Sequence, residues 1–486
     1  MMVKTKHGML RGYEDEQIAV FKGIPYAKPP VGDLRWKAPQ PAEDWVGVKP
    51  ATEFGPASAQ PTFSQNYAGQ ILTNDGPKGE DCLYLNIWTP KKAVKPGHSL
   101  PVLFIIHGGG FKFFSGATSA FDGLELAKKD IVVVTINYRL GVMGFFAHPE
   151  LSSENPNHVS GNYGILDQIA ALQWVHDNIA SFGGDPDQIT ICGESAGAFS
   201  ISVLYSSPLA KGLFCRATAQ SGGFMDRETV MYKQMMLHEA EDFFSGICNG
   251  KNLAELRRMS ADELIEMTAS VSFTPVRDNY VFQYDNKQAI KEKCLSDIPL
   301  LIGSNCDEGT LFADQSGNSD TFAALAMQLV GADKMPDFLK LYPNGNKEET
   351  VRSQIQLNSD NAWGHNMYTW AKLHSNYSNN DAYLYYYCHV PPGSDFGAHH
   401  SSEIVYFHHN LRHTEKAWTK ADFSLEEALS SYLVNFIKTG NPNGEGLTNW
   451  IPFGEDEDKI MVIEDEPCMA PNPTLQAMRF WDANEK

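Results

Sequence analysis

Short apolar runs alternate with amphipathic segments along most of the chain. The segment 166–182, LDQIAALQWVHDNIASF, has the apolar spacing of a helix, whereas the runs have the length and the β-branched or aromatic content of buried strands. These runs lie at residues 99–110, 130–139, 187–192, 215–222, 297–305 and 382–390. Apolar strands that alternate with amphipathic helices predict an α/β fold with a large, mostly parallel sheet covered on both faces.

Two long stretches interrupt this alternation. Residues 225–295 and 313–380 have mostly helical patterns, and we expect them to be insertions that cover the carboxyl ends of the strands. The chain shows no internal repeat and no long low-complexity linker. Although 486 residues could form several domains, we predict a single domain over residues 1–486.

The pentapeptide GESAG at 193–197 follows the third predicted strand directly, and a helical pattern begins after its serine. A sharp turn from strand to helix strains the backbone of the corner residue, and the flanking Gly193 and Gly197 let the two elements approach each other. Ser195 would then project above the start of the helix. Because so short a motif also arises by chance, the rest of the chain must supply a base, an acid and an oxyanion site.

Further candidate groups follow other predicted strands, at the edge where such sheets carry their active sites. A serine hydroxyl needs a base to take its proton, histidine titrates in the right range, and an acid must orient the imidazole. The candidates are the pair Asp307–Glu308 after the fifth strand and the pair His399–His400 beyond the sixth. The order serine, acid, histidine is that of the α/β-hydrolases.

The HGGG segment at 107–110 follows the first strand. It is a candidate for the site that stabilises the negative charge on the oxyanion during catalysis. Its glycines allow the backbone to curl so that two N–H groups point at one position, and the N–H of Ala196 adds a third donor. A plain turn is the alternative. The position after a strand, together with the other candidate groups, favours the oxyanion site.

Composition and charge exclude several classes of protein. The hydrophobic content of 42% is ample for a large core, and the net charge of −20 argues against nucleic acid and anionic membranes as partners. No apolar run reaches the roughly 18 residues of a transmembrane helix. The first residues lack the apolar core of a signal peptide, which favours a cytoplasmic protein, or a secreted one whose signal has been removed.

The eight cysteines are scattered and include no C-x-x-C pair, so we expect buried free thiols rather than zinc ligands. The histidine pairs 399–400 and 408–409 admit a metal site as an alternative. Adjacent side chains on a strand or helix point apart, however, and no H-E-x-x-H motif is present. We therefore expect no metal and no cofactor.

Longer stretches that span nearly the whole chain carry a family resemblance. They include FKGIPYAKPPVGDLRW (21–36), EDCLYLNIWTP (80–90), HGGGF (107–111), NYRLGVMGF (137–145), GNYGILDQIAALQWVHDNIASFGGDP (161–186), GESAG, QSGG (220–223), DEG (307–309) and HSSE (400–403). Together they resemble the type-B carboxylesterases, the family of the cholinesterases and the bacterial para-nitrobenzyl esterases, and are most similar to the bacterial type. The resemblance implies an α/β-hydrolase fold and a serine esterase.

The resemblance also implies residue roles that spacing left open. In the family's D-E-G motif the glutamate is the acid, so Glu308 is favoured over Asp307. The family histidine precedes x-x-E, so His400 is favoured over His399 as the partner of the nucleophile Ser195. The positions that match the family's oxyanion hole are Gly109, Gly110 and Ala196.

Other matching positions concern the scaffold. The pairs Arg35–Glu80 and Arg139–Asp167 match structural ion pairs of the family. Cys82 matches a cysteine that is disulfide-bonded in the animal members. No cysteine precedes position 82, so that disulfide cannot form here. This agrees with a disulfide-free setting.

The sequence thus predicts a serine carboxylesterase that hydrolyses short-chain or aromatic carboxylic esters through an acyl-enzyme, with a small-molecule ester as its partner. A non-catalytic binding protein of the same fold is one alternative, although Ser195, Glu308 and His400 are all present. A metal-dependent hydrolase using the histidine-rich segment 399–413 is the other. Some of the aromatic residues in 111–114, 383–390 and 404–409 are candidates for pocket walls. The sequence carries no signal for oligomeric state.

Overall fold

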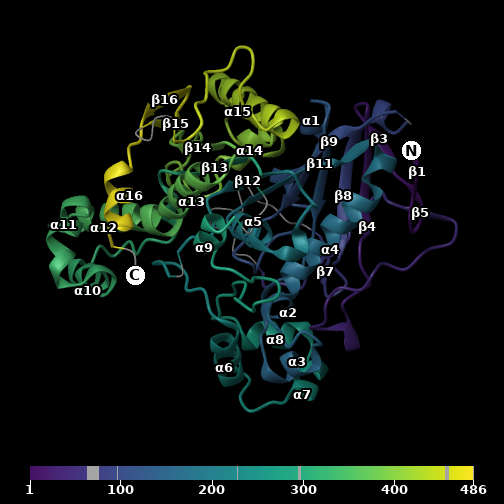
Figure 1. Ribbon diagram of the computed structural model, residues 1–486, viewed down its shortest axis with the longest axis horizontal. Helices are drawn as coiled ribbons and strands as arrows, with labels where there is room; N and C mark the ends of the chain where they lie inside the picture. The colour runs from purple at the N-terminus through teal and green to yellow at the C-terminus, as the bar shows by residue number, and fades with distance from the viewer. Residues whose placement is uncertain (63–75, 96, 227, 294–296, 455–458, 485–486) are drawn as a thin grey trace.

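The computed structural model describes residues 1–62, 76–95, 97–226, 228–293, 297–454 and 459–484 (Figure 1). Within these residues an 11-stranded sheet forms the centre of the molecule. Its strands in spatial order are β16 (Pro467–Pro471), β15 (Lys459–Ile463), β14 (Ala382–Tyr387), β13 (Leu300–Asn305), β12 (Arg216–Gln220), β11 (Gly184–Glu194), β9 (Leu100–Ile106), β10 (Val132–Ile136), β8 (Tyr84–Pro90), β4 (Ile18–Pro25) and β3 (Tyr13–Asp15).

The predicted strands form the middle of this sheet. Strands β9 to β14 correspond to the apolar runs, and they pair in parallel with one another and with β15. The antiparallel strands β8, β4 and β3 extend one edge and β16 the other. The predicted α/β fold with a mostly parallel sheet is confirmed. The antiparallel edge strands were not predicted, because their segments lack the regular alternation with helices.

Two small sheets lie outside the central one among the described residues. Strands β1 (Met2–Thr5), β2 (Gly8–Arg11) and β5 (Val48–Pro50) form the first, and β6 (Ala57–Ser58) pairs with β7 (Lys78–Gly79) in the second. Both belong to the N-terminal part of the chain, drawn in purple in Figure 1.

Helices cover both faces of the central sheet, as the burial of its strands requires. Val102 and Phe104 of β9 belong to one apolar core, whereas Leu103 and Ile105 belong to the other, because successive side chains of a strand point to opposite faces. The first core packs against α2 (Gly141–Phe145), α4 (Tyr163–Asn178), α5 (Ala196–Ser206) and α13 (His365–Tyr377). The second packs against α1 (Leu124–Ala127), α14 (Ile404–Phe407) and α15 (Lys420–Thr439).

The remaining helices lie mainly in the two long segments on either side of β13. Between β12 and β13 the chain forms α6 (Leu237–Ile247), α7 (Leu253–Arg258), α8 (Ala261–Met267) and α9 (Asn286–Lys291), with irregular chain at 268–285. Between β13 and β14 it forms α10 (Ser319–Val330), α11 (Met335–Leu341), α12 (Lys347–Asn358), a π-helix at Ser359–Gly364 and then α13. Two further helices are α3 (Pro149–Glu154) and α16 (Leu475–Asp482).

Both ion pairs expected in the scaffold are present. The guanidinium of Arg139 donates to the two carboxylate oxygens of Asp167 at 2.8 and 2.7 Å, and both side chains are almost fully buried. Arg35 donates to Glu80 and also to the carbonyl oxygen of Met259 at 2.7 Å. The first pair ties α4 to the chain after β10, and the second ties the N-terminal region to the end of α7.

The described cysteines are free thiols, but they are less uniformly buried than the sequence suggested. Cys82, whose family disulfide was not expected, is a buried thiol, whereas Cys468 on the edge strand β16 is exposed. Cys294 lies outside the described residues. Among the residues that the structure describes, no helix is both long enough and apolar enough to cross a membrane.

Candidate active site

Ser195 occupies the corner between β11 and α5. Its backbone has φ 54° and ψ −122°, a strained conformation for a residue other than glycine. A Cβ on Gly197 would lie 2.1 Å from the carbonyl oxygen of Ile106, and a Cβ on Gly193 would lie 2.5 Å from the carbonyl carbon of Gly197. Glycine is therefore required on both sides of the serine. Gly193 allows the approach of β11 and α5 that the motif predicted, whereas Gly197 allows α5 to approach the end of β9.

The three residues proposed for the oxyanion hole lie around the same cavity as Ser195. Gly109 and Gly110 have φ of 99° and 60°, a backbone region that favours glycine. Ala196 is the first residue of α5, where a backbone N–H has no partner within the helix. The N–H groups of all three make no hydrogen bond with any described residue, so they are available to an oxygen atom in the cavity.

Glu308 and His400 form a buried pair. Glu308 follows β13 in a short 3₁₀ turn, and its carboxylate accepts a hydrogen bond from Nδ1 of His400. The other carboxylate oxygen accepts from the hydroxyl of Ser221 and from the backbone N–H of Asn305, the latter at 2.8 Å. Neither the Glu308 nor the His400 side chain is more than 7% exposed, so the pair is held in a nearly water-free environment.

The other ring nitrogen of His400 faces a second carboxylate. Nε2 lies 3.2 Å from Oε1 of Glu194, the residue before Ser195, and Ser401 also donates to that oxygen. The hydroxyl of Ser195 makes no hydrogen bond with any described residue, although Ser195 and His400 line the same cavity. Hydrogen bonds between nucleophile and base are commonly long before substrate binds and tighten in the complex.

The charges around His400 change its titration. Burial by itself would lower the pKa of His400, but the carboxylates of Glu194 and Glu308 outweigh burial and raise this pKa to about 9. Burial raises the pKa of Glu194 to about 7, and burial with the neighbouring carboxylates raises that of Glu403 to about 8. Because His400, Glu194 and Glu403 interact strongly, the protonation of each depends on the charge of the others, and the three groups titrate together.

The two neighbours that the sequence left as alternatives point elsewhere. The carboxylate of Asp307 accepts from the backbone N–H of Ala398 at 2.8 Å and from the thiol of Cys306 at 3.2 Å, and it does not contact the His400 ring. Nδ1 of His399 lies 2.8 Å from the carbonyl oxygen of His400. Glu308 and His400 are thus the acid and the histidine that the structure brings together.

Two contacts in this cluster were missed in the sequence. Ser221 was noted only as part of the stretch QSGG, and Glu194 only as a variable position inside GESAG. Glu194 is the last residue of β11 and Ser221 follows β12, at the edge that carries the other candidates, and this position was the available signal. Ser221 also has a positive φ of 55°, which the sequence could not reveal because serine does not require it.

The cavity in front of Ser195 has a volume of about 470 Å³. Its walls come from the glycine-rich segment after β9, from residues 269–274 and from the π-helix at 359–364. Of the aromatic runs considered, only the first reaches the cavity, because the rings of β14 and α14 are buried in the cores. The aromatic walls include Phe111, Phe113, Phe114, Phe224, Phe312 and Trp363.

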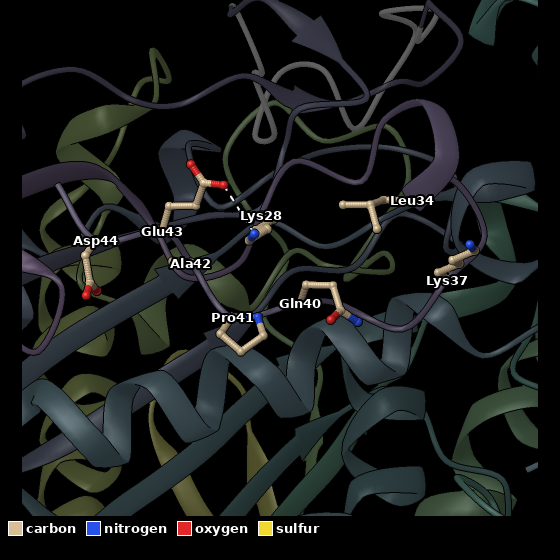
Figure 2. Close-up of a pocket in the computed structure, with 8 residues that line it drawn as sticks. All are labelled: Lys28, Leu34, Lys37, Gln40, Pro41, Ala42, Glu43 and Asp44. Carbon is tan, nitrogen blue, oxygen red and sulfur yellow. Dashed lines mark ion pairs between the residues drawn. The ribbon is translucent and has the colours of Figure 1, made fainter. Parts of the chain in front are cut away.

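A second hollow of about 810 Å³ lies elsewhere on the surface, near the N-terminal segment (Figure 2). It is open and carries both signs of charge, and Figure 2 shows the ion pair between Lys28 and Glu43 across it. None of the candidate catalytic residues lines it. The smaller cavity, which is lined by Ser195, His400 and the three candidate oxyanion-hole residues, is therefore the candidate active site.

The histidine pairs considered as metal ligands are not arranged for that purpose. Among the described residues, no group of three or more His, Cys, Asp or Glu side chains is placed so that it could hold a metal ion. His408 is buried, with Nε2 at 3.6 Å from the sulfur of Cys192.

Known proteins resemble the chain over nearly its full length. The sequence model of the carboxylesterase family matches residues 1–481. A para-nitrobenzyl esterase of Bacillus subtilis is 34% identical over 495 residues, which cover 97% of this chain and 96% of that protein. A fumonisin B1 esterase of Sphingopyxis macrogoltabida is 34% identical over 484 residues, which cover 94% of this chain and 85% of that protein.

Solved structures agree with these relatives. A para-nitrobenzyl esterase structure superposes with a TM-score of 0.86 at 32% identity and covers 99% of both chains. A carboxylesterase of Geobacillus stearothermophilus gives the same TM-score at 33% identity and also covers 99% of both. The α/β-hydrolase fold and the resemblance found in the sequence are confirmed. The chain therefore belongs to the carboxylesterase family and is a carboxylic-ester hydrolase.

Proposed function

We propose that the protein cleaves esters by nucleophilic catalysis at Ser195. His400 takes the serine proton during attack on the ester carbonyl and returns it to the leaving alcohol. The N–H groups of Gly109, Gly110 and Ala196 hold the oxyanion. Water, activated by the same His400, then hydrolyses the acyl-enzyme, and Glu308 keeps the imidazole oriented throughout.

The buried hydrogen bond between Glu308 and His400, beside a strained Ser195 in one cavity, carries this proposal. A fluorophosphonate probe tests it, because the probe reacts covalently only with an activated serine. We expect labelling at Ser195 and loss of esterase activity in proportion to labelling. A protein that neither reacts with the probe nor hydrolyses esters would instead be the non-catalytic binding protein, and loss of activity with a chelator alone would favour the metal-dependent hydrolase.

We propose short-chain and aromatic-alcohol esters as the substrate class. The cavity is mainly apolar and aromatic, and Lys112, Glu194 and His400 are the charged or ionisable groups, apart from Tyr232, among its described lining residues. Apolar contact would supply binding while the oxyanion donors orient the carbonyl. The net charge of −20 disfavours anionic esters at long range.

A series of para-nitrophenyl esters of increasing acyl length measures this preference. We expect the highest kcat/KM for acetate or butyrate and little activity on long-chain triglycerides. A kcat/KM that rises steadily to long acyl chains would contradict the proposed class while leaving the serine mechanism intact.

We propose that the protein acts in a reducing compartment such as the cytoplasm. The free thiols of the described cysteines support this, because an oxidising compartment favours disulfides. The acidic surface supports a small-molecule partner rather than nucleic acid or an anionic membrane.

A further inference from the structure

Two cysteines face each other at the carboxyl ends of neighbouring parallel strands. The ladder between β13 and β14 ends with Asn305 opposite Tyr387, so Cys306 and Cys388 are the next pair in register. The N–H of Cys306 donates to the carbonyl oxygen of Tyr387 at 2.9 Å, which continues the ladder by one step. Both thiols are free and only half-buried.

This register places the two thiols within bonding reach. Neighbouring strands lie about 4.8 Å apart, and paired residues carry their side chains on the same face of the sheet. Disulfides join Cα atoms that are about 4.4–6.8 Å apart. The pair thus meets the distance requirement without a large movement of the backbone.

The pair also touches a contact that supports the catalytic loop. Cys306 donates to the carboxylate of Asp307, and the same Oδ2 atom accepts the N–H of Ala398. Asp307 and His399 form a bridge between the two segments, and His400 follows directly. The Cys306 thiol is therefore connected through two hydrogen bonds, both made by Oδ2 of Asp307, to the segment that presents the catalytic histidine.

We propose that Cys306 and Cys388 form a reversible dithiol–disulfide pair, and that its oxidation by a small-molecule disulfide lowers the turnover of the adjacent active site. The proposal goes beyond ester hydrolysis, since the bond itself can be measured without any substrate.

The exchange balances with the oxidant alone. One cysteine thiolate attacks the disulfide RS–SR and forms a mixed disulfide, releasing RS⁻, which takes up the proton that the thiol lost. The second cysteine thiolate attacks the cysteine sulfur of that mixed disulfide, which closes the Cys306–Cys388 bond and releases a second RS⁻, and this RS⁻ takes up the proton that the second thiol lost. Two electrons pass from the cysteine pair to the oxidant, and a dithiol reductant reverses both steps.

The environment of Cys306 controls the rate. Its hydrogen bond with Cys388, its burial and the neighbouring Asp307 carboxylate all raise the pKa of the Cys306 thiol. Because the thiolate is the reactive form, we expect oxidation to be slow at neutral pH and faster at alkaline pH.

Oxidation should slow catalysis because it removes the thiol hydrogen through which Cys306 donates to Asp307. A sulfur in the disulfide has no proton, so Asp307 loses the Cys306 hydrogen bond while it still holds Ala398. The segment 397–400 is then less well fixed, and a misplacement of about 1 Å can cost about 10²-fold in rate. We expect oxidation to lower kcat by up to about this factor and to change KM much less, because the cavity walls stay in place.

The purified, reduced protein is incubated with oxidised glutathione and then digested without reduction. We expect mass spectrometry to find a peptide linked through residues 306 and 388, together with a lower kcat on para-nitrophenyl acetate that dithiothreitol restores. Absence of the linked peptide, after free-thiol counting has shown that oxidant consumed other thiols, would overturn the proposal. A linked protein with unchanged kcat would also overturn it.

Cys388→Ser and Cys468→Ser form the matched pair of variants. Neither residue contacts the catalytic groups, so both variants should keep the basal activity. Cys388→Ser should lose the linked peptide and the reversible fall in kcat, whereas Cys468→Ser, which removes an exposed thiol, should retain both. Cys388→Ala replaces Cys388→Ser if the serine variant folds poorly. A reversible fall in kcat on oxidation that is undiminished in either Cys388 variant would contradict the proposed Cys306–Cys388 pair.

Discussion

Ser221 donates its hydroxyl hydrogen to Glu308, on the carboxylate oxygen that does not contact the histidine. This hydrogen bond, with the N–H of Asn305, determines which oxygen of Glu308 remains for the imidazole. Both side chains are fully buried, so solvent does not compete with the hydroxyl for this oxygen.

Removing this hydroxyl tests its role as a positioning group. A hydrogen bond to a charged group is worth about 1.5–3 kcal/mol, so Ser221→Ala should lower kcat by roughly 10- to 10²-fold and leave KM nearly unchanged. Steady-state kinetics on para-nitrophenyl acetate measures this. Ser206→Ala, which removes another buried serine hydroxyl that donates to backbone oxygens in α5, is the control and should keep its kcat.

Ser195→Ala should lower kcat on the order of 10⁶-fold without unfolding the protein, by analogy with other serine hydrolases. Circular dichroism checks the fold, and a sensitive fluorogenic ester measures the residual rate. His400→Ala should be nearly as damaging, whereas His399→Ala should cost far less, since Nδ1 of His399 lies against the carbonyl oxygen of His400 and not against Glu308. Equal losses at the two histidines would leave the base unassigned.

The length of the acid side chain is a further test. Glu308→Asp shortens the reach by one methylene and should lower kcat by about 10²-fold through misplacement of His400. Glu308→Gln should be worse still, because it removes the charge that stabilises the imidazolium. The role assigned to Glu308 fails if both variants turn over at the wild-type rate.

The pH dependence of kcat/KM should reveal the effect of the Glu194 carboxylate on His400. A general base must be neutral to act, and the pKa of His400 is raised to about 9, so activity should increase as pH rises through the alkaline range. Glu194→Gln removes a carboxylate that raises this pKa, so the rising limb of kcat/KM should move to lower pH. A limb that stays in place, or moves upward, would show that Glu194 does not act on His400.

The buried ion pair between Arg139 and Asp167 should matter for stability rather than chemistry. Asp167→Asn leaves a buried guanidinium without its counter-charge, and breaking such a pair typically costs about 3–5 kcal/mol in the free energy of unfolding. Denaturant unfolding measures the loss. The exposed pair Asp337–Lys340 provides the control, since water screens its charges and Asp337→Asn should change the free energy of unfolding far less than Asp167→Asn does.

The sequence by itself determined the local features of this protein. The apolar runs predicted the parallel strands β9 to β14, because a strand buried on both faces must be apolar along its length. The turn at GESAG could also be predicted, since the approach of β11 and α5 requires glycine at 193. In each case the cause lies within a few residues of the pattern.

Tertiary structure decided which distant groups meet. From spacing alone Asp307 and Glu308 were equivalent, and only the packing of segment 397–400 beside β13 directs Glu308 to His400 and Asp307 to Ala398. The hydroxyl of Ser221, a strand away, is likewise assigned by the sheet. The pairing of Cys306 with Cys388 depends on the register of β13 and β14, which is set by contacts along the whole length of both strands and therefore cannot be inferred from the residues around either cysteine alone.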